Sequence, residues 1–115
     1  MTISPYSIPG IIKTKAVTPQ RIINTVCYYF GIEYKKIIGK RRNSEIIFAR
    51  FIAIYLICNE IKVGSKEISF VKVGEIFNKD RTTVSHACET IDGFISIKDS
   101  KTITALNELK ILIKQ

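Results

Sequence analysis

The chain has few of the residues that carry side-chain catalysis or bind metals. It contains no Trp, one His and three Cys. Cys27, Cys58 and Cys88 are 31 and 30 residues apart with no CxxC pair, which fits neither a disulfide framework nor a zinc site. Each lies on an apolar helical face, which predicts buried, reduced thiols and a cytoplasmic protein. His86 is the single His, so nucleophiles such as Ser85 have no second His to activate them. We therefore expect no enzyme and no cofactor.

Long hydrophobic runs and nucleotide-binding motifs are also absent from the sequence. The most apolar stretch, Ile46–Cys58, has 13 residues and contains Arg50, so it is too short to span a bilayer. The N-terminus lacks a basic segment followed by an apolar core, which excludes a signal peptide pattern. The short apolar run leads us to expect no membrane association. No GxxxxGK[ST] loop occurs, so we also expect no nucleotide as a partner.

Acidic residues are scarce relative to basic ones. The chain has 18 Lys and Arg against 10 Asp and Glu, for a net charge of +8. Residues 1–60 carry nine of the basic side chains and only three Glu. The segment from Lys35 to Arg42 contains five cations and no acid. Such clustering suits a polyanionic partner, although on charge alone it fits a solvated surface equally well.

The remaining pattern predicts one all-α domain, a compact bundle of five to six helices. Residues 1–17 have no helical period and contain Pro5, Pro9 and Gly10, so they are expected to form an irregular arm before a domain over 18–115. Caps, stops and apolar spacing predict helices over 19–30, 33–38, 44–60, 69–77, 81–94 and from 99 or 100 onward, with a polar loop over 62–68.

The most informative stretch is Phe77–Ala87, where one short helix ends and another begins. Asp80 stands where an N-cap is favoured, and Arg81, Thr82 and Thr83 follow it in the first turn. These side chains can bond base edges or phosphates. A helix, a tight turn and a helix with a polar, basic first turn is the layout of a DNA-reading helix-turn-helix. A capped but merely polar surface helix would show the same local pattern.

Three motifs resemble the C-terminal DNA-binding domain of the bacterial replication initiator DnaA. Lys79–Ala87 is similar to that family's pattern Arg/Lys-Asp-His-Ser/Thr-Thr-Val-x-His-Ala. Upstream, Lys40-Arg41-Arg42 followed by Arg50 resembles its basic loop and long helix, and Ser69–Gly74 resembles its Ser-x-x-Glu-Ile-Gly. The resemblance runs from about Arg21 to the C-terminus and implies a Trp-repressor-like helix-turn-helix.

The chain departs from the family pattern at several positions. Arg81 replaces the usual His, Phe51 stands where a polar residue is common, and Lys72 replaces an acid. The loop from Lys62 to Ile68 is about four residues longer than in the best-known members, and a frequent Gly-Gly is missing after the first helix of the motif. These changes are compatible with the fold and leave the preferred DNA sequence open.

The resemblance assigns DNA contacts to two groups of side chains. In the recognition helix, Arg81 is placed to reach guanine and a Thr methyl to pack on thymine, while Asp80 can cap the helix and accept from cytosine. In the basic loop and long helix, Arg residues are implied to reach the minor groove and phosphates. The full set of expected DNA-binding residues is Arg41, Arg42, Arg50, Ser69, Lys72, Lys79, Asp80, Arg81, Thr82, Thr83 and His86.

Three of these assignments have plain structural alternatives. His86 fits a phosphate contact or a partly buried packing role. Arg50 interrupts an apolar helix, so its head either contacts DNA, reaches solvent or pairs with Glu45 or Glu60. Ser69 and the free N–H groups beside it can hold a phosphate, to which Lys72 would add attraction.

Five aromatic side chains recur at helical spacing and are expected in the core. They are Tyr28, Tyr29, Phe48, Phe51 and Tyr55. We do not expect them to form a stacking platform for single strands, because such a platform usually lies on a sheet.

The sequence therefore predicts a module for sequence-specific binding of double-stranded DNA, acting at a replication origin through sites similar to the family's boxes. A regulatory role in a phage or mobile element is the other setting that suits it. The rival hypothesis is a protein-interaction module that binds a replication partner and no longer reads DNA. Oligomeric state is left open.

Overall fold

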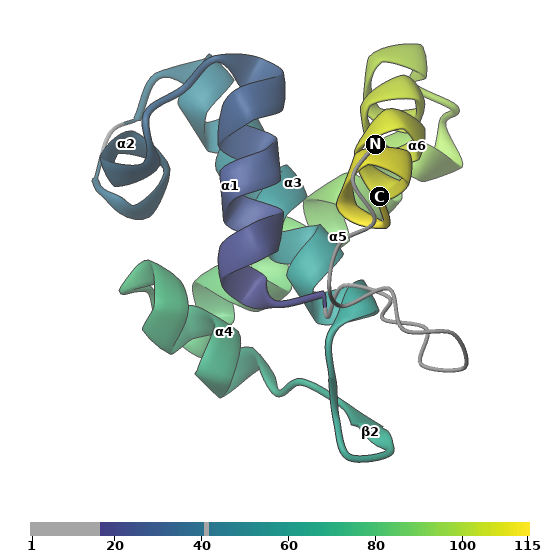
Figure 1. Cartoon of the computed structure of the whole chain (residues 1–115). Helices are drawn as coiled ribbons and strands as arrows, with labels where there is room; N and C mark the ends of the chain where they lie inside the picture. The colour runs from purple at the N-terminus through teal and green to yellow at the C-terminus, as the bar shows by residue number, and fades with distance from the viewer. Residues whose placement is uncertain (1–16, 41) are drawn as a thin grey trace, which may run out of the picture.

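The computed structural model describes residues 17–40 and 42–115, and within them the chain is an all-α bundle with one small hairpin (Figure 1). The expected arm, apart from Val17, and Arg41 lie outside the described residues. The elements are α1 (Pro19–Phe30), α2 (Tyr34–Ile38), α3 (Ser44–Glu60), β1 (Lys62–Val63), β2 (Lys66–Glu67), α4 (Phe70–Phe77), α5 (Arg81–Ser96) and α6 (Ser100–Ile113). The predicted fold class is confirmed.

The first helix begins and ends where local chemistry predicts. The Thr18 side chain accepts from the Arg21 backbone N–H, and Pro19 occupies the first turn, where its missing N–H costs nothing. Gly31 closes the helix in the left-handed conformation, with φ of 66°. The Arg21 guanidinium then donates to the carbonyls of Ile113 and Gln115, 3.0 Å away in each case, and so ties α1 to the end of α6.

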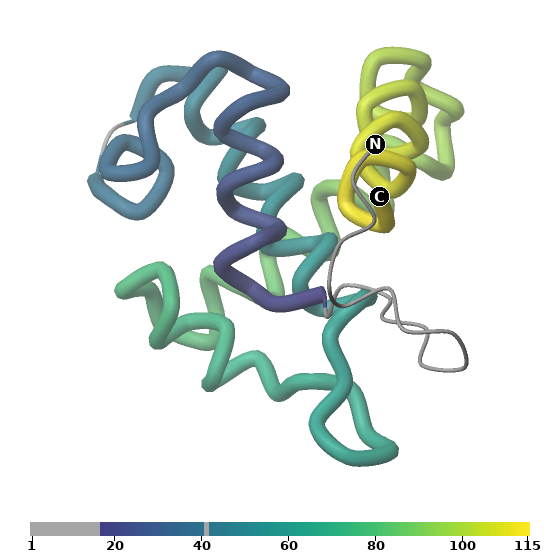
Figure 2. The backbone as a smooth tube through the Cα atoms, in the orientation of Figure 1, coloured from purple at the N-terminus to yellow at the C-terminus, as the bar shows by residue number. Residues whose placement is uncertain are grey.

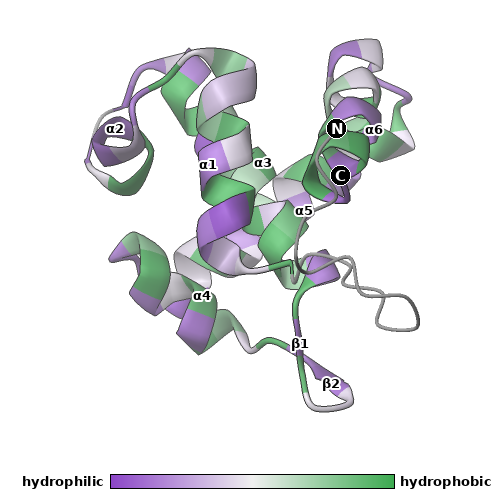
Figure 3. Ribbon diagram, in the orientation of Figure 1, coloured by the Kyte–Doolittle hydropathy of each residue, from purple (hydrophilic) through white to green (hydrophobic). Residues whose placement is uncertain are grey.

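Helix α3 forms the centre of the bundle. Nine of its seventeen residues are buried, and it packs against α1, α2, α4 and α5. Figure 3 shows the contrast with α4, along which hydrophobic and hydrophilic residues alternate. Because α3 is apolar around most of its circumference, it is stable only when other helices cover it on several sides.

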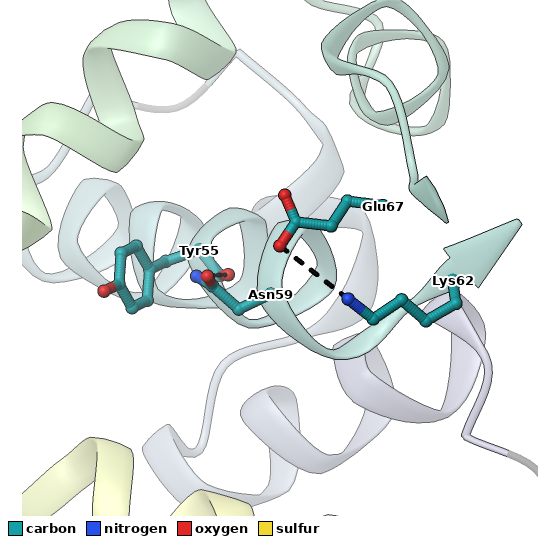
Figure 4. A network of polar contacts seen from close by, with 4 residues as sticks. All are labelled: Tyr55, Asn59, Lys62 and Glu67. Atoms are coloured by element: carbon teal, nitrogen blue, oxygen red, sulfur yellow. Dashed lines mark hydrogen bonds and ion pairs between the residues drawn. The ribbon is translucent and has the colours of Figure 1, made fainter. Parts of the chain in front are cut away.

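The loop after α3 differs from the prediction. In place of a loop without strands, β1 and β2 pair antiparallel with Lys62 opposite Glu67, and Gly64 takes a φ of 67° at the turn. The Lys62 and Glu67 side chains form an ion pair of 3.8 Å beside the end of α3 (Figure 4). Both are more than half exposed, so this pair contributes little stability. The extra residues of this loop are enough to close a hairpin.

Helices α4 and α5 meet at a tight turn, which the backbone trace makes easy to follow (Figure 2). Asn78 takes the left-handed conformation with φ of 55°, and the Lys79 N–H donates to the Gly74 carbonyl at 2.9 Å. A Cβ on Gly74 would lie 2.4 Å from the Lys79 carbonyl oxygen. Gly74 therefore permits the close approach of turn and helix.

The predicted core position of Tyr28 is wrong, because 81% of this residue is exposed on α1. At about 100° per residue, Tyr28 lies roughly 160° around the helix from the buried Val26 and roughly 120° from Ile22, so it falls on the side of α1 away from the core. The other four aromatic residues pack, partly buried, against the core. All three cysteines are free, but only Cys58 is fully buried.

Candidate DNA-binding interface

The N-terminus of α5 is organised by its own first turn. The Asp80 carboxylate accepts from the Thr83 backbone N–H at 2.9 Å and from the Thr83 hydroxyl at 3.0 Å. These bonds hold the pKa of Asp80 below its usual range. The predicted cap is confirmed. Since Thr83 is turned toward the cap, the exposed side chains of this turn are Arg81 and Thr82.

Helix α4 is capped in a similar way. Ser69 accepts from the Lys72 N–H at 3.2 Å, as expected of an N-cap. The side chains of Ser69 and Lys72 are both exposed, so a phosphate at this helix start would meet free N–H groups and a cation. The structure places this pair on the first helix of the motif, separate from the recognition turn of α5.

A surface hollow of about 470 Å³ lies beside the first turn of α5. Four cations from three separate parts of the sequence line it, together with Ile47, Phe51 and Thr83. The cations are Lys40, Arg42, Arg50 and Lys79. We call this hollow with its four cations the basic hollow.

The cations of the basic hollow repel one another. Partial burial lowers the pKa of Lys79, and the positive charges of Arg50, Lys40 and Arg42 lower it further. A bound anion would relieve this repulsion. The hollow is therefore electrostatically suited to a phosphate or to the negative potential of a DNA groove.

Arg50 takes neither structural alternative that the sequence suggested, a head free in solvent or a pair with Glu60. Only 5% of the residue is exposed, where it lines the basic hollow. Its guanidinium donates to the Ile37 carbonyl at 2.6 Å and to the Lys36 carbonyl at 3.0 Å. Glu60, a suggested partner, pairs instead with Lys114. Burial, followed by the charge of Arg42, lowers the pKa of Arg50. A charge within the apolar helix is tolerated because backbone carbonyls satisfy it.

His86 is exposed on α5, one turn beyond Thr82 and Thr83, and also makes a packing contact. Its ring meets the Phe51 ring edge-on, with centroids 5.8 Å apart. This contact orients the imidazole while leaving it accessible. A phosphate contact by His86 stays a prediction.

The structure adds two residues that the expected set omitted. Lys40 and Phe51 both line the basic hollow. Lys40 belongs to the same basic run as Arg42, so that run was signal enough to include it. Phe51 gave a weaker signal: it stands where the family commonly has a polar residue, but an aromatic residue in an apolar helix is ordinarily core. Arg41 has no assigned place, since it lies outside the described residues.

The described part of the chain has neither a cluster of side chains that could hold a metal nor a helix that could span a membrane. Between residues 17–40 and 42–115, no group of three or more His, Cys, Asp and Glu side chains is arranged to hold a metal ion. In the same ranges, no helix has both the length and the apolar character needed to cross a membrane.

Comparison with known proteins identifies the family. Residues 19–91 match the family model described as the bacterial dnaA protein helix-turn-helix. The chain is 34% identical to the chromosomal replication initiator protein DnaA of Bacteroides thetaiotaomicron over its whole length. It is 38% identical to that of Bacteroides fragilis over 90% of the chain, and 36% identical to that of Caldanaerobacter subterraneus over 89%.

The chain spans only part of these relatives. It matches 24%, 21% and 22% of their respective lengths. The region matched by the family model includes α1 to α4 and α5 as far as Ile91, and thus the whole turn and the basic hollow. The three sequence motifs, the helix order and these matches agree. The chain therefore belongs to the family of the helix-turn-helix domain of bacterial DnaA proteins.

Proposed function

We propose that this chain binds double-stranded DNA in a sequence-specific manner, with the first turn of α5 in the major groove and the basic loop at the adjacent minor groove. The observation that carries the proposal is the basic hollow, in which cations far apart in sequence converge beside an exposed, capped helix start. Opposite charges within the hollow could have neutralised it. Instead, its four charged lining residues all have the same sign.

The proposed base contacts lie on α5. Arg81 carries five fixed donors and is exposed, so it can bond guanine O6 and N7 together. Thr82 is exposed beside it and offers a methyl group to thymine. Asp80 and Thr83 are engaged with each other, and we assign them mainly to shaping this turn.

The proposed backbone and minor-groove contacts come from the basic loop, the start of α4 and α5. They are Lys40, Arg41, Arg42, Ser69, Lys72 and His86. These groups fix the register of the protein on the duplex and supply most of its salt-dependent affinity. Arg50 and Lys79, which donate to carbonyls at the end of α2, take supporting positions instead of direct contacts.

The biological setting of this proposal is replication initiation or its control. The relatives from the two Bacteroides species are chromosomal replication initiators, and we infer that this chain recognises a short DNA site of the kind that their helix-turn-helix domains serve. The replacement of the family's usual His by Arg81 implies a site of altered sequence. A phage or mobile-element regulator would use the same interface.

Salt-dependent binding tests the proposal. Duplex DNA selected from a random pool should bind with an affinity that falls steeply with salt, at a log–log slope of roughly −3 to −6, because several phosphates are neutralised. A flat salt response, or no duplex binding at low salt, would favour the rival interaction module, in which the basic hollow serves no nucleic acid.

A further inference from the structure

The end of α2 is held by two cations from other parts of the chain. Arg50, on α3, donates to the carbonyls of Lys36 and Ile37. Lys79, in the turn before α5, donates through Nζ to the Gly39 carbonyl at 3.0 Å. All three carbonyls belong to the last turn of α2 or come directly after it.

Helix α2 needs this support, because it has only five residues. A helix of that length is far below the limit for independent stability in water. Its last carbonyls have no partners within the helix and carry the negative end of its dipole. Cations bonded there satisfy the carbonyls and hold the helix end in a fixed place.

The basic loop begins directly after α2, and the recognition helix begins directly after the turn that contains Lys79. Arg42 lies three residues after Gly39, whereas Arg81 lies two residues after Lys79. The Lys79–Gly39 hydrogen bond therefore links the residue before the basic loop to the turn before α5, across 40 residues of sequence.

We propose that Lys79 and Arg50 are positioning residues, which hold the end of α2 and thereby set the place of Arg42 relative to the first turn of α5. This inference rests on the proposed function, since the spacing of the two elements matters only if both reach one duplex. Affinity then depends on geometry that neither element fixes by itself.

The test uses Lys79→Met, which removes the donor and retains most of the side-chain stem. The matched control is Lys72→Met. Lys72 is an exposed lysine of the same motif, so this substitution removes the same charge. In the free protein, ¹⁵N relaxation should show lower order parameters at the amides of Gly39 and Arg42 in Lys79→Met only. Lys79→Arg, which retains a donor, should restore them.

Duplex binding supplies the second readout, through a double-mutant cycle with Arg42→Ala. In the wild-type background Arg42→Ala should weaken binding. In Lys79→Met its effect should be smaller by about fivefold or more, because Arg42 is already misplaced. With Lys72→Met the two effects should be independent.

Unchanged order parameters at Gly39 and Arg42, or independent effects of Lys79→Met and Arg42→Ala on affinity, would overturn the positioning role. Failure of the proposed function looks different. If wild-type protein binds no duplex, the DNA proposal falls, while the relaxation measurement still decides whether Lys79 holds the end of α2.

Discussion

The start of α5 is held by groups three residues apart, whereas the end of α2 is held by side chains 13, 14 and 40 residues away. Asp80 and Thr83 complete their bonds within one helical turn. The end of α2 depends on Arg50 and Lys79, which can contact it only when α3 and the helix-turn-helix have packed against α2. One half of the proposed interface is thus a local structure, and the other is a product of tertiary packing.

This difference has a consequence for variation within the interface. Exposed residues of a locally determined turn, such as Arg81, can change without moving the turn that presents them. The basic loop is different, because a change at Lys79 or Arg50 alters the place of a segment that contains neither residue. We therefore expect sequence preference to be altered most easily on α5.

The largest expected effect on stability comes from substituting Gly74, where α4 and the turn before α5 lie in close contact. A Cβ there would meet the Lys79 carbonyl oxygen at 2.4 Å, so helix and turn must move apart. Gly74→Ala should lower the free energy of unfolding by about 1–3 kcal/mol, measured by urea denaturation. Gly93→Ala is the control. A Cβ added at Gly93 would have no atom within 4 Å, so this substitution should raise the free energy of unfolding by about 0.5–1 kcal/mol. Equal effects would contradict the assigned role of Gly74.

A smaller effect on stability is expected from the Asp caps of α5 and α6. Asp80 and Asp99 each accept from a Thr three residues later, and those bonds lower the pKa of both carboxyls. Because the folded pKa is depressed, the stabilisation is complete above the unfolded value of about 4 and is lost as pH falls through the folded value.

Asp80→Asn and Asp99→Asn should therefore each lower the thermal midpoint at pH 7, with the difference from wild type shrinking below about pH 4. Only Asp80→Asn should also weaken DNA binding, since α6 has no place in the proposed interface. Thermal melts over pH 2–7 and duplex titrations at pH 7 check this. A loss of binding in Asp99→Asn would show that general stability, not the α5 cap, governs affinity.

The local parts of this structure can be predicted from the sequence. Helices are predicted to begin next to Thr18, at Ser69, at Asp80 or Arg81 and at Asp99 or Ser100. In the structure Thr18, Ser69, Asp80 and Asp99 each accept an N–H three residues later. The polar turn after Phe77 was equally readable. These features depend on residues within one turn of the chain, so the pattern contains nearly all of the relevant physics.

Contacts between residues that are remote in the sequence cannot be predicted from the local pattern. Burial of Arg50 depends on carbonyls of α2, and the pairing of β1 with β2 depends on how the chain leaves α3. In each case the deciding contact has no counterpart in the local pattern.

The most direct test of sequence reading by α5 compares Arg81→Ala with Arg42→Ala in competitive binding to a selected site and to a scrambled duplex. Arg81→Ala should cost about 1–3 kcal/mol on the selected site and much less on the scrambled one, because it removes a base contact. Arg42→Ala should weaken both more evenly. Arg81→His should shift the preferred sequence without unfolding the protein, which circular dichroism checks. If Arg81→Ala lowers both affinities equally, Arg81 is a backbone contact and the first turn of α5 does not read the sequence as proposed.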